Sequence, residues 1–548
     1  MGLRYALPVM CVAWVLAAMD FAAPQAAQVP RAPADSHAGP MFQTSHDCLA
    51  CHNGLTTSTG EDVSIGSSWR ASIMANASRD PYWQASVRRE MIDHPAARAE
   101  IEDECAICHM PMSRAQAVTS GGRGEIFAHL PIGRGEAAAD ALAADGVSCS
   151  LCHQIRDDKL GTRESFTGGF VLDRAPSAGP RSIFGPFEID QGRTTIMRSA
   201  TGFKPTEASH VRQSELCATC HTLYTTALGP GGKAIGELPE QVPYLEWRHS
   251  AFREERSCQS CHMPTVREKM PITSVLGEPR EGLARHSFVG GNFFMLRMLN
   301  RYRVELGVEA LPVELDAAAR RTVQFLQSET AEIAVESARV STGRLEFDID
   351  VKNLAGHKLP SAYPSRRVWL HVSVRDATGQ TIFESGAVGL NGRIEGNDHD
   401  VDPFVYEPHY MEIRRPQEVQ IYESIMAGAD GRPTTGLLTA VQFIKDNRLL
   451  PRGFDKATAE ADIAVRGDAA RDTNFAANGD RVRYSIDLAT RSGPFEVQAE
   501  LFYQPISFRW AQNLRSYEAP ETKRFVTYFE SMSAGTAEVL ARSTRSVP

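Results

Sequence analysis

Outside five short motifs, the chain contains almost no cysteine. Ten of its 11 cysteines form Cys-x-x-Cys pairs, and the remaining one, Cys11, lies in an apolar stretch near the N-terminus. No thiol in the body of the protein is therefore left for a structural disulfide or a catalytic nucleophile. The chain also lacks a later apolar run as long as a membrane helix, so we expect no membrane span in the mature protein.

Positive charge is also scarce. The 58 lysines and arginines are outnumbered by 67 aspartates and glutamates, which gives a formal net charge of -9. An acidic chain repels the phosphates of nucleic acids, so nucleic acid is excluded as a partner. Redox partner proteins with basic patches are expected instead.

Each of the five cysteine pairs is followed directly by histidine. Two thiols one helical turn apart can add to the two vinyl groups of one porphyrin, and the adjacent imidazole can bind its iron. A zinc knuckle or a thiol redox couple does not require that histidine in every copy. The sequence therefore predicts five covalently bound haem c groups, each with one iron. The motifs, numbered 1 to 5 in chain order, are Cys48-Leu-Ala-Cys51-His52, Cys105-Ala-Ile-Cys108-His109, Cys149-Ser-Leu-Cys152-His153, Cys217-Ala-Thr-Cys220-His221 and Cys258-Gln-Ser-Cys261-His262.

The N-terminus is typical of an export signal. Arg4 precedes a mostly apolar stretch at residues 5–19, and small residues follow at 22–27. An uncleaved anchor is the alternative interpretation. Export to the periplasm or the cell exterior fits the haems, because bacteria attach haem c outside the cytoplasmic membrane.

The pattern along the chain predicts an α+β fold. The motifs are unevenly spaced, which excludes a solenoid of equal repeats and favours short helices and long loops packed around haems. Helices are expected at residues 291–307 and 312–328. Alternating apolar and polar residues then predict strands at 333–340, 345–351, 368–374, 381–384, 419–424, 481–488 and 495–502. We predict a signal peptide at 1–27, a pentahaem domain at 28–328, an antiparallel β-sandwich-like domain at 329–505 and a C-terminal helical tail at 506–548.

Five six-coordinate irons need ten axial ligands, and the motif histidines supply five of them. Local context singles out four further histidines as distal ligands: His210, His249, His286 and His357. His94 and His129 are equal candidates for the fifth distal position. A histidine just before its own motif is badly placed for the opposite face of the same haem, so His210 and His249 are expected to bind neighbouring haems.

Three other histidines and one acidic segment are not expected to bind haem iron or another metal. His371 is expected in a strand, and His399 and His409 in surface loops. The acidic segment 397–402 resembles a calcium loop in its alternating carboxylates. It lacks the glycine and the terminal glutamate of an EF-hand, so a solvated loop is favoured.

Several sequence segments resemble those of exported bacterial multihaem cytochromes of the cytochrome c-552/c-554-like group. They include Cys105-Ala-Ile-Cys-His-Met-Pro-Met112, Gly146-Val-Ser-Cys-Ser-Leu-Cys-His153 and Gly356-His-Lys-Leu-Pro-Ser-Ala-Tyr-Pro-Ser-Arg-Arg-Val-Trp369. The resemblance covers nearly all of the mature chain, and it implies electron transfer by mainly bis-histidine haems. Four-haem members are familiar, so five motifs and a long β-rich segment depart from that pattern.

Three functions are compatible with these features, and electron transfer is favoured. The alternative is a multihaem oxidoreductase that acts on a small nitrogen or sulfur compound at one open-site haem. All five motifs end in histidine, and no Cys-x-x-Cys-Lys variant marks a specialised catalytic haem. A third hypothesis is that the β-rich segment docks another redox protein or other copies of the chain.

Overall fold

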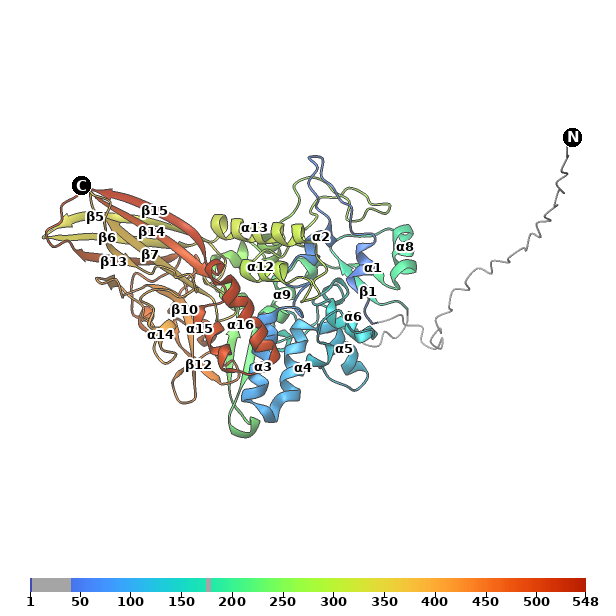
Figure 1. Ribbon diagram of the computed structural model, residues 1–548. Helices are drawn as coiled ribbons and strands as arrows, with labels where there is room; N and C mark the ends of the chain where they lie inside the picture. Colours follow the sequence, from blue (N-terminus) through green and yellow to red (C-terminus); the bar gives the residue numbers. More distant parts are fainter. Residues whose placement is uncertain (2–40, 174–178) are drawn as a thin grey trace. The chain divides into compact units, whose positions relative to one another are not determined.

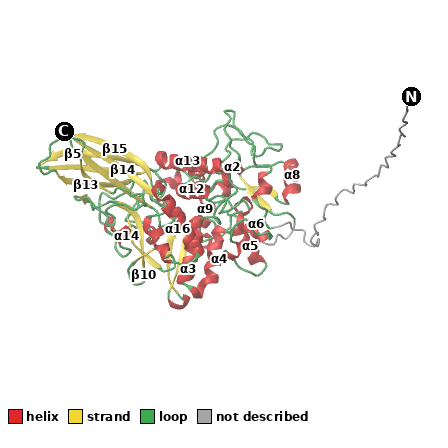
Figure 2. Ribbon diagram, viewed as in Figure 1, coloured by secondary structure: helices red, strands yellow, loops and turns green. Residues whose placement is uncertain are grey.

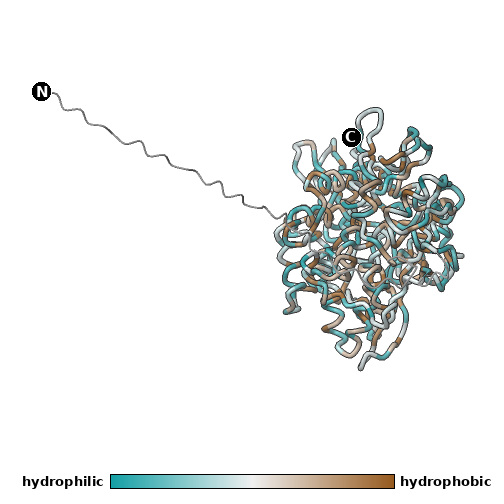
Figure 3. The backbone as a smooth tube through the Cα atoms, turned by 90° about the vertical axis from the view of Figure 1, so that its right-hand side faces the viewer, coloured by the Kyte–Doolittle hydropathy of each residue, from teal (hydrophilic) through white to brown (hydrophobic). Residues whose placement is uncertain are grey.

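The computed structural model describes Met1 and residues 41–173 and 179–548 (Figure 1). Helices and mainly antiparallel sheets make up the fold, which confirms the predicted α+β class. The predicted signal peptide beyond Met1, including Cys11, lies outside the described residues. Within the described ranges, no helix is long and apolar enough to cross a membrane. Hydrophilic and hydrophobic segments alternate along the whole folded tube (Figure 3).

Short helices joined by loops carry the motifs. Asp80 shows how such a helix begins: its carboxylate accepts from the backbone N–H groups of Tyr82 (2.8 Å) and Trp83 (3.1 Å), and Pro81 occupies the first helical position. The helices are α1 (Ser45–Leu49), α2 (Ile65–Arg70), α3 (Pro81–Asp93), α4 (Arg98–His109), α5 (Pro111–Thr119), α6 (Ala138–Ala144), α7 (Cys149–Cys152), α8 (Gln191–Thr201), α9 (Ser214–His221), α10 (Pro243–Arg248) and α11 (Cys258–His262).

Two small sheets and two longer helices complete this region. The parallel pair is β1 (Ser182–Gly185) with β2 (Lys204–Glu207), and the antiparallel pair is β3 (Leu223–Leu228) with β4 (Ala234–Gln241). The two helices predicted after the motifs are present. They are α12 (Phe293–Arg301), which is shorter than expected, and α13 (Pro312–Glu329).

The later part of the chain forms two larger sheets, whose strands group together in Figure 2. A four-stranded sheet has the order β5-β6-β13-β9, and a seven-stranded sheet has the order β11-β10-β7-β14-β15, with β12 on β10 and β8 on β7. Every predicted strand is present. The bounds are β5 (Ala331–Ser341), β6 (Arg344–Asn353), β7 (Arg367–Arg375), β8 (Thr381–Ser385), β9 (Glu412–Ile413), β10 (Ile421–Gly428), β11 (Pro433–Thr434), β12 (Ala440–Asp446), β13 (Gly479–Asp487), β14 (Phe495–Gln504) and β15 (Glu538–Val547).

The core lies between these sheets because their strands alternate. Phe347, Ile349 and Val351 of β6 are buried in the same apolar cluster as Val497 and Leu501 of β14. Side chains two residues apart share one face of a strand, so each sheet presents one apolar face to the other. The alternation of apolar and polar residues that predicted the strands therefore also provides the apolar faces that pack between the two sheets.

The C-terminal tail is not helical throughout, and this corrects the prediction for residues 506–548. Helices α15 (Phe508–Asn513) and α16 (Pro520–Met532) are followed by β15, which pairs antiparallel with β14 from Phe495↔Val547. Without β15, this edge of β14 would present unpaired backbone groups, and pairing with them outweighs local composition. Helix α16 packs back on α3, where Arg88 and Glu521 form an ion pair at 2.9 Å.

Candidate haem-binding site

The motifs sit on or beside single helical turns. Motif 2 ends α4, motif 4 ends α9, and motif 5 makes up all of α11; the first four residues of motif 3 form α7, and His153 follows it. In motif 1, α1 ends just after Cys48, and Cys51 and His52 follow in a turn. Cysteines three residues apart on a helical turn lie on the same side, as attachment to one porphyrin requires.

Residues far apart in sequence bring the five motifs into one contiguous group. The thiols of Cys48 (motif 1) and Cys149 (motif 3) are close enough to share a hydrogen bond. The same holds for Cys108 with Cys220, which joins motifs 2 and 4.

Motif 4 is the centre of this group. The thiol of Cys217 also lies close to that of Cys258 in motif 5, and it is near enough to Cys152 of motif 3 for the two thiols to interact electrostatically. Motif 4 therefore adjoins three of the other four motifs. The ten cysteines of the motifs are all free, so no disulfide competes with haem attachment.

Two motif histidines face a second histidine at the separation that a shared metal would impose. The ring centroids of His153 and His286 are 6.4 Å apart with planes at 24°, and those of His262 and His357 are 6.3 Å apart with planes at 6°. With nitrogen–metal bonds of about 2 Å, two imidazoles on opposite sides of one metal have centroids roughly 6 Å apart. Both pairs fit a six-coordinate haem iron.

Hydrogen bonds fix the tautomer of all four rings. The Nδ1 atoms of His153 and His286 donate to the carbonyls of Phe184 (2.5 Å) and Ala284 (3.0 Å). Those of His262 and His357 donate to the carbonyls of Val289 (2.6 Å) and Lys358 (2.9 Å). A proton on Nδ1 leaves the lone pair on Nε2 for a metal.

Two further motif histidines have the same arrangement. The Nδ1 atoms of His52 and His109 donate to the carbonyls of Ile272 (2.7 Å) and Ala77 (3.1 Å), and Trp83 stacks on the His109 ring at 4.2 Å. Burial lowers the pKa of His109 to about 4, so this ring is neutral at pH 7. Neutral imidazole is the form that binds metals. Burial also lowers the pKa of His221 in motif 4.

The structure does not bring the other four candidates into such pairs. His210 is buried near His153, with its Nε2 on the carbonyl of Ile155 (2.8 Å). His249 uses Nε2 in the same way, toward Asp455 (2.9 Å). Their assignment as distal ligands stays a prediction.

His94 and His129 are held by polar side chains. His94 has Nε2 3.4 Å from the hydroxyl of Thr439. His129 uses both ring nitrogens, Nδ1 on Asp140 (2.6 Å) and Nε2 on Ser113 (3.2 Å). The choice between these two for the fifth position therefore stays open.

Two expectations for the other histidines were wrong. His399 and His409 are buried rather than on surface loops. The segment 397–402 is only partly solvated, because Asp400 is buried against Arg367 at 2.8 Å whereas Asp398, Val401 and Asp402 are exposed. His399 lies in a short helix, α14 (Asp398–Val401), and a polar sequence does not reveal the burial of either histidine. His371 lies in β7, as predicted.

His409, Asp472 and Asp480 form a buried cluster with the composition of a metal site. However, Nδ1 of His409 accepts from the amide groups of Gln420 (2.8 Å) and Asn447 (3.1 Å). The proton therefore sits on Nε2, which donates to Asp472 at 3.2 Å. The cluster is therefore a buried hydrogen-bonded group rather than a metal site, because Nε2 of His409, which would bind the metal, already carries the proton.

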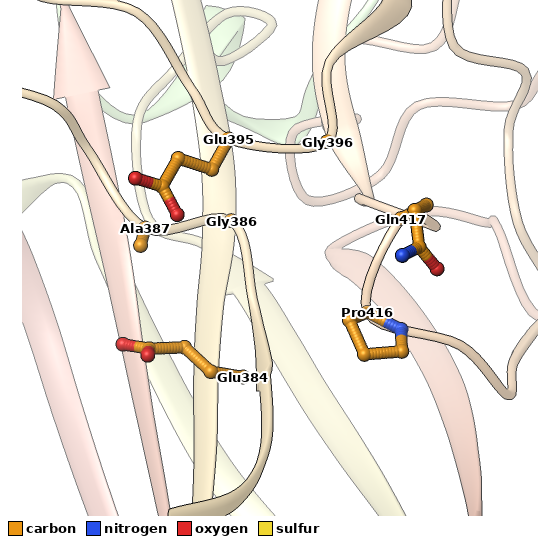
Figure 4. Close-up of a pocket in the computed structure, with 7 residues that line it drawn as sticks. All are labelled: Glu384, Gly386, Ala387, Glu395, Gly396, Pro416 and Gln417. Carbon is orange, nitrogen blue, oxygen red and sulfur yellow. The ribbon is translucent and has the colours of Figure 1, made fainter.

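A pocket of about 160 Å³ lies in the β-rich region, away from the motifs (Figure 4). Two acidic side chains, Glu384 and Glu395, lie on one side of it, and Pro416 and Gln417 lie on the other. Its remaining lining residues are Gly386, Ala387 and Gly396. None of these residues belongs to a cysteine–histidine motif.

The chain has the fold of a solved multihaem cytochrome. That protein is a penta-haem cytochrome c552 from Thermochromatium tepidum, with a TM-score of 0.51 and 14% sequence identity; the match covers 92% of this chain and 99% of the other. No family model and no curated protein match the sequence. The likeness is one of fold, and it extends over nearly the whole of both chains.

Proposed function

We propose that this protein is an exported c-type cytochrome that carries five covalent haems and passes electrons among them. One observation carries the proposal: the five motifs, spread over more than 200 residues of sequence, adjoin one another through the thiol contacts of Cys48, Cys108 and Cys217. Haems attached to adjoining motifs would lie close together, and bound haem supplies reversible one-electron chemistry at its iron.

The axial ligands in this proposal are mainly histidines on both faces. His286 is the distal ligand for the haem of motif 3, and His357 for that of motif 5, as supported by the centroid distances of 6.4 and 6.3 Å. His210, His249 and either His94 or His129 are the proposed ligands for the others. Iron capped on both sides has no position for substrate, which favours an electron carrier over a catalyst.

The location and partners follow from the same chemistry. Haem c attachment and the predicted N-terminal signal support a location in the periplasm or outside the cell. The formal charge of -9 favours redox partner proteins with basic docking patches. Self-association through the β-rich region is a further proposal.

Haem counting and electron paramagnetic resonance test the proposal. Intact mass and a pyridine haemochrome assay of the secreted protein should give five haems per chain. The oxidised protein should show low-spin signals that do not change with nitrite or hydroxylamine. A smaller haem count would contradict the cofactor assignment, and a high-spin signal that shifts with either compound would favour the open-site oxidoreductase.

A further inference from the structure

A buried carboxyl group beside motif 2 is not used by the haem ligation described above. Glu240 of β4 is only 5% exposed, and its carboxylate accepts a hydrogen bond from the hydroxyl of Thr225 on β3 at 2.5 Å. It lies close enough to both thiols of motif 2, Cys105 and Cys108, to influence them electrostatically. Glu240 is therefore next to the place where one haem would be attached.

The charged groups that act on Glu240 are acidic. Glu90 of α3 and Glu104 of α4 both face it and disfavour its ionised form. The buried hydroxyl of Tyr363 lies close enough to feel the charge of Glu240 as well. No cation is among the groups that shift Glu240 in the described part of the chain, so its charge is poorly compensated.

Glu90 and the charged residues of the neighbouring strand β12 are already engaged. Glu90 accepts from the backbone N–H groups of Leu437 (2.9 Å) and Leu438 (3.4 Å), and it lies 3.8 Å from both Arg89 and His94. Strand β12 also packs against β4, and its charged residues Lys445 and Asp446 are paired with Glu423, Lys358 and Arg448. Glu90 thus has several polar partners, whereas Glu240 has a single hydroxyl donor.

We propose that Glu240 is a proton-binding site coupled to the haem of motif 2. Glu240 takes up one proton from solvent when one electron, delivered by a redox partner protein, enters that haem, and it releases the proton when the electron leaves. The added electron makes its surroundings more negative, which disfavours the carboxylate further. This inference rests on the proposed electron-transfer function.

The titration range suits such a role. Burial, assisted by Glu90 and Glu104, raises the pKa of Glu240 to about 7. A group with a pKa near the ambient pH changes its protonation in response to a small change in nearby charge. Protein reduction would then consume protons, and the midpoint potential would depend on pH.

Redox titration of the full-length holoprotein at several pH values tests the proposal. In the wild type, one component of the titration should shift with pH around pH 7, by at most about 59 mV per tenfold change in proton concentration for a one-electron step. Glu240→Gln keeps the side-chain shape and should abolish this dependence. Glu237→Gln, on the same strand but exposed, is the matched control and should retain it.

Infrared difference spectra provide a second, site-specific measurement. Reduction of the wild type at pH 7 should produce a protonated-carboxyl band that is absent in Glu240→Gln. Thr225→Val removes the hydroxyl donor to the charged form, so the pH-dependent range should move upward. A pH dependence and a band that persist in Glu240→Gln would overturn the inference while leaving the five haems intact. A protein without reversible haem redox chemistry would instead overturn the proposed function.

Discussion

Replacement of Asp446 tests how the β-rich region holds His357 against motif 5. Asp446 accepts from Nζ of Lys358 (2.7 Å) and from Arg448 (2.8 Å), and Arg448 also pairs with Glu246 of α10 at 2.8 Å. Lys358 directly follows His357. The two cations and two carboxylates balance in charge, and they connect the end of β12 to the loop that carries the predicted ligand.

Asp446→Asn should destabilise the protein by about 3–5 kcal/mol. The substitution leaves one net positive charge among groups that are almost inaccessible, since Lys358 is 0% and Arg448 8% exposed, and removal of one partner from a buried ion pair has this cost. The net contribution of the interactions of Asp446 with Lys358 and Arg448 to the free energy of unfolding is smaller than this loss. Arg448 and Lys358 lower the pKa of Asp446 to about 2 from 3.8 despite its burial, a difference worth about 2.4 kcal/mol. Burial lowers the pKa of Lys358 even though Asp446 raises it, which shows that desolvation offsets part of the attraction.

The pH dependence has a defined sign. Because the pKa of Asp446 is lower in the folded state, its stabilisation is fully present above pH 3.8 and is lost as the pH falls toward 2. The Asp446→Asn protein should lack this component of acid denaturation. Its unfolding free energy should therefore approach that of the wild type at the lowest pH.

Chemical denaturation of the holoprotein, followed by circular dichroism at pH 7, measures the loss. Asp350→Asn is the control, because Asp350 pairs with Arg481 at 2.5 Å on an exposed face and should contribute at most about 1 kcal/mol. Equal losses in the two variants would refute the reasoning. In paramagnetic resonance, Asp446→Asn should also broaden a low-spin signal, since the His357 loop loses its anchor.

Three further predictions concern the haem sites and their support. His286→Ala should convert one low-spin paramagnetic resonance signal to high-spin, because it removes the ring whose centroid lies 6.4 Å from that of His153. His371→Ala, the control, should leave the spectrum unchanged. An unchanged spectrum in both variants would exclude His286 as a ligand. Replacement of Cys217 and Cys220 by serine should remove one haem, as measured by intact mass. It should also lower thermal stability more than the same change at Cys48 and Cys51, since motif 4 adjoins three other motifs. An equal or smaller loss of stability would contradict the central position of motif 4. Gly291→Ala should lower the free energy of unfolding in urea by about 1–3 kcal/mol, because the new Cβ would lie 2.5 Å from the hydroxyl of Tyr503. Gly290→Ala is the control, since a Cβ there would meet open space. Similar losses in both variants would contradict this packing.

Local sequence pattern was sufficient for seven strands of the β-rich region and for the two helices that follow the motifs. The alternation in residues 345–351 predicted a strand because one face of β6 packs into the core and the other does not, and this property depends only on neighbouring residues. The same holds for α13, which begins at Pro312, a preferred first helical residue. Strand β15 could not be predicted in this way, since its pairing partner β14 ends more than 30 residues earlier.

The buried polar residues were missed for a related reason. His409 and Asp400 lie in polar segments, and their burial depends on partners distant in sequence, such as Asp472 for His409 and Arg367 for Asp400. Sequence alone predicts a solvated loop in both cases. A signal that could have been used is a pair of arginines directly before a predicted strand, together with an acidic segment about 30 residues later.

The sequence by itself determined the cofactor chemistry expected of this protein, because two thiols and an imidazole within five residues are sufficient to specify a haem attachment site. It also determined a list of histidines from which the distal ligands are to be drawn. Only the tertiary structure decided that motif 4 is central and that His286 faces His153 and His357 faces His262. The two histidine pairs join residues 133 and 95 positions apart in the chain, and only the packing of sheets, loops and helices brings them within a few ångströms.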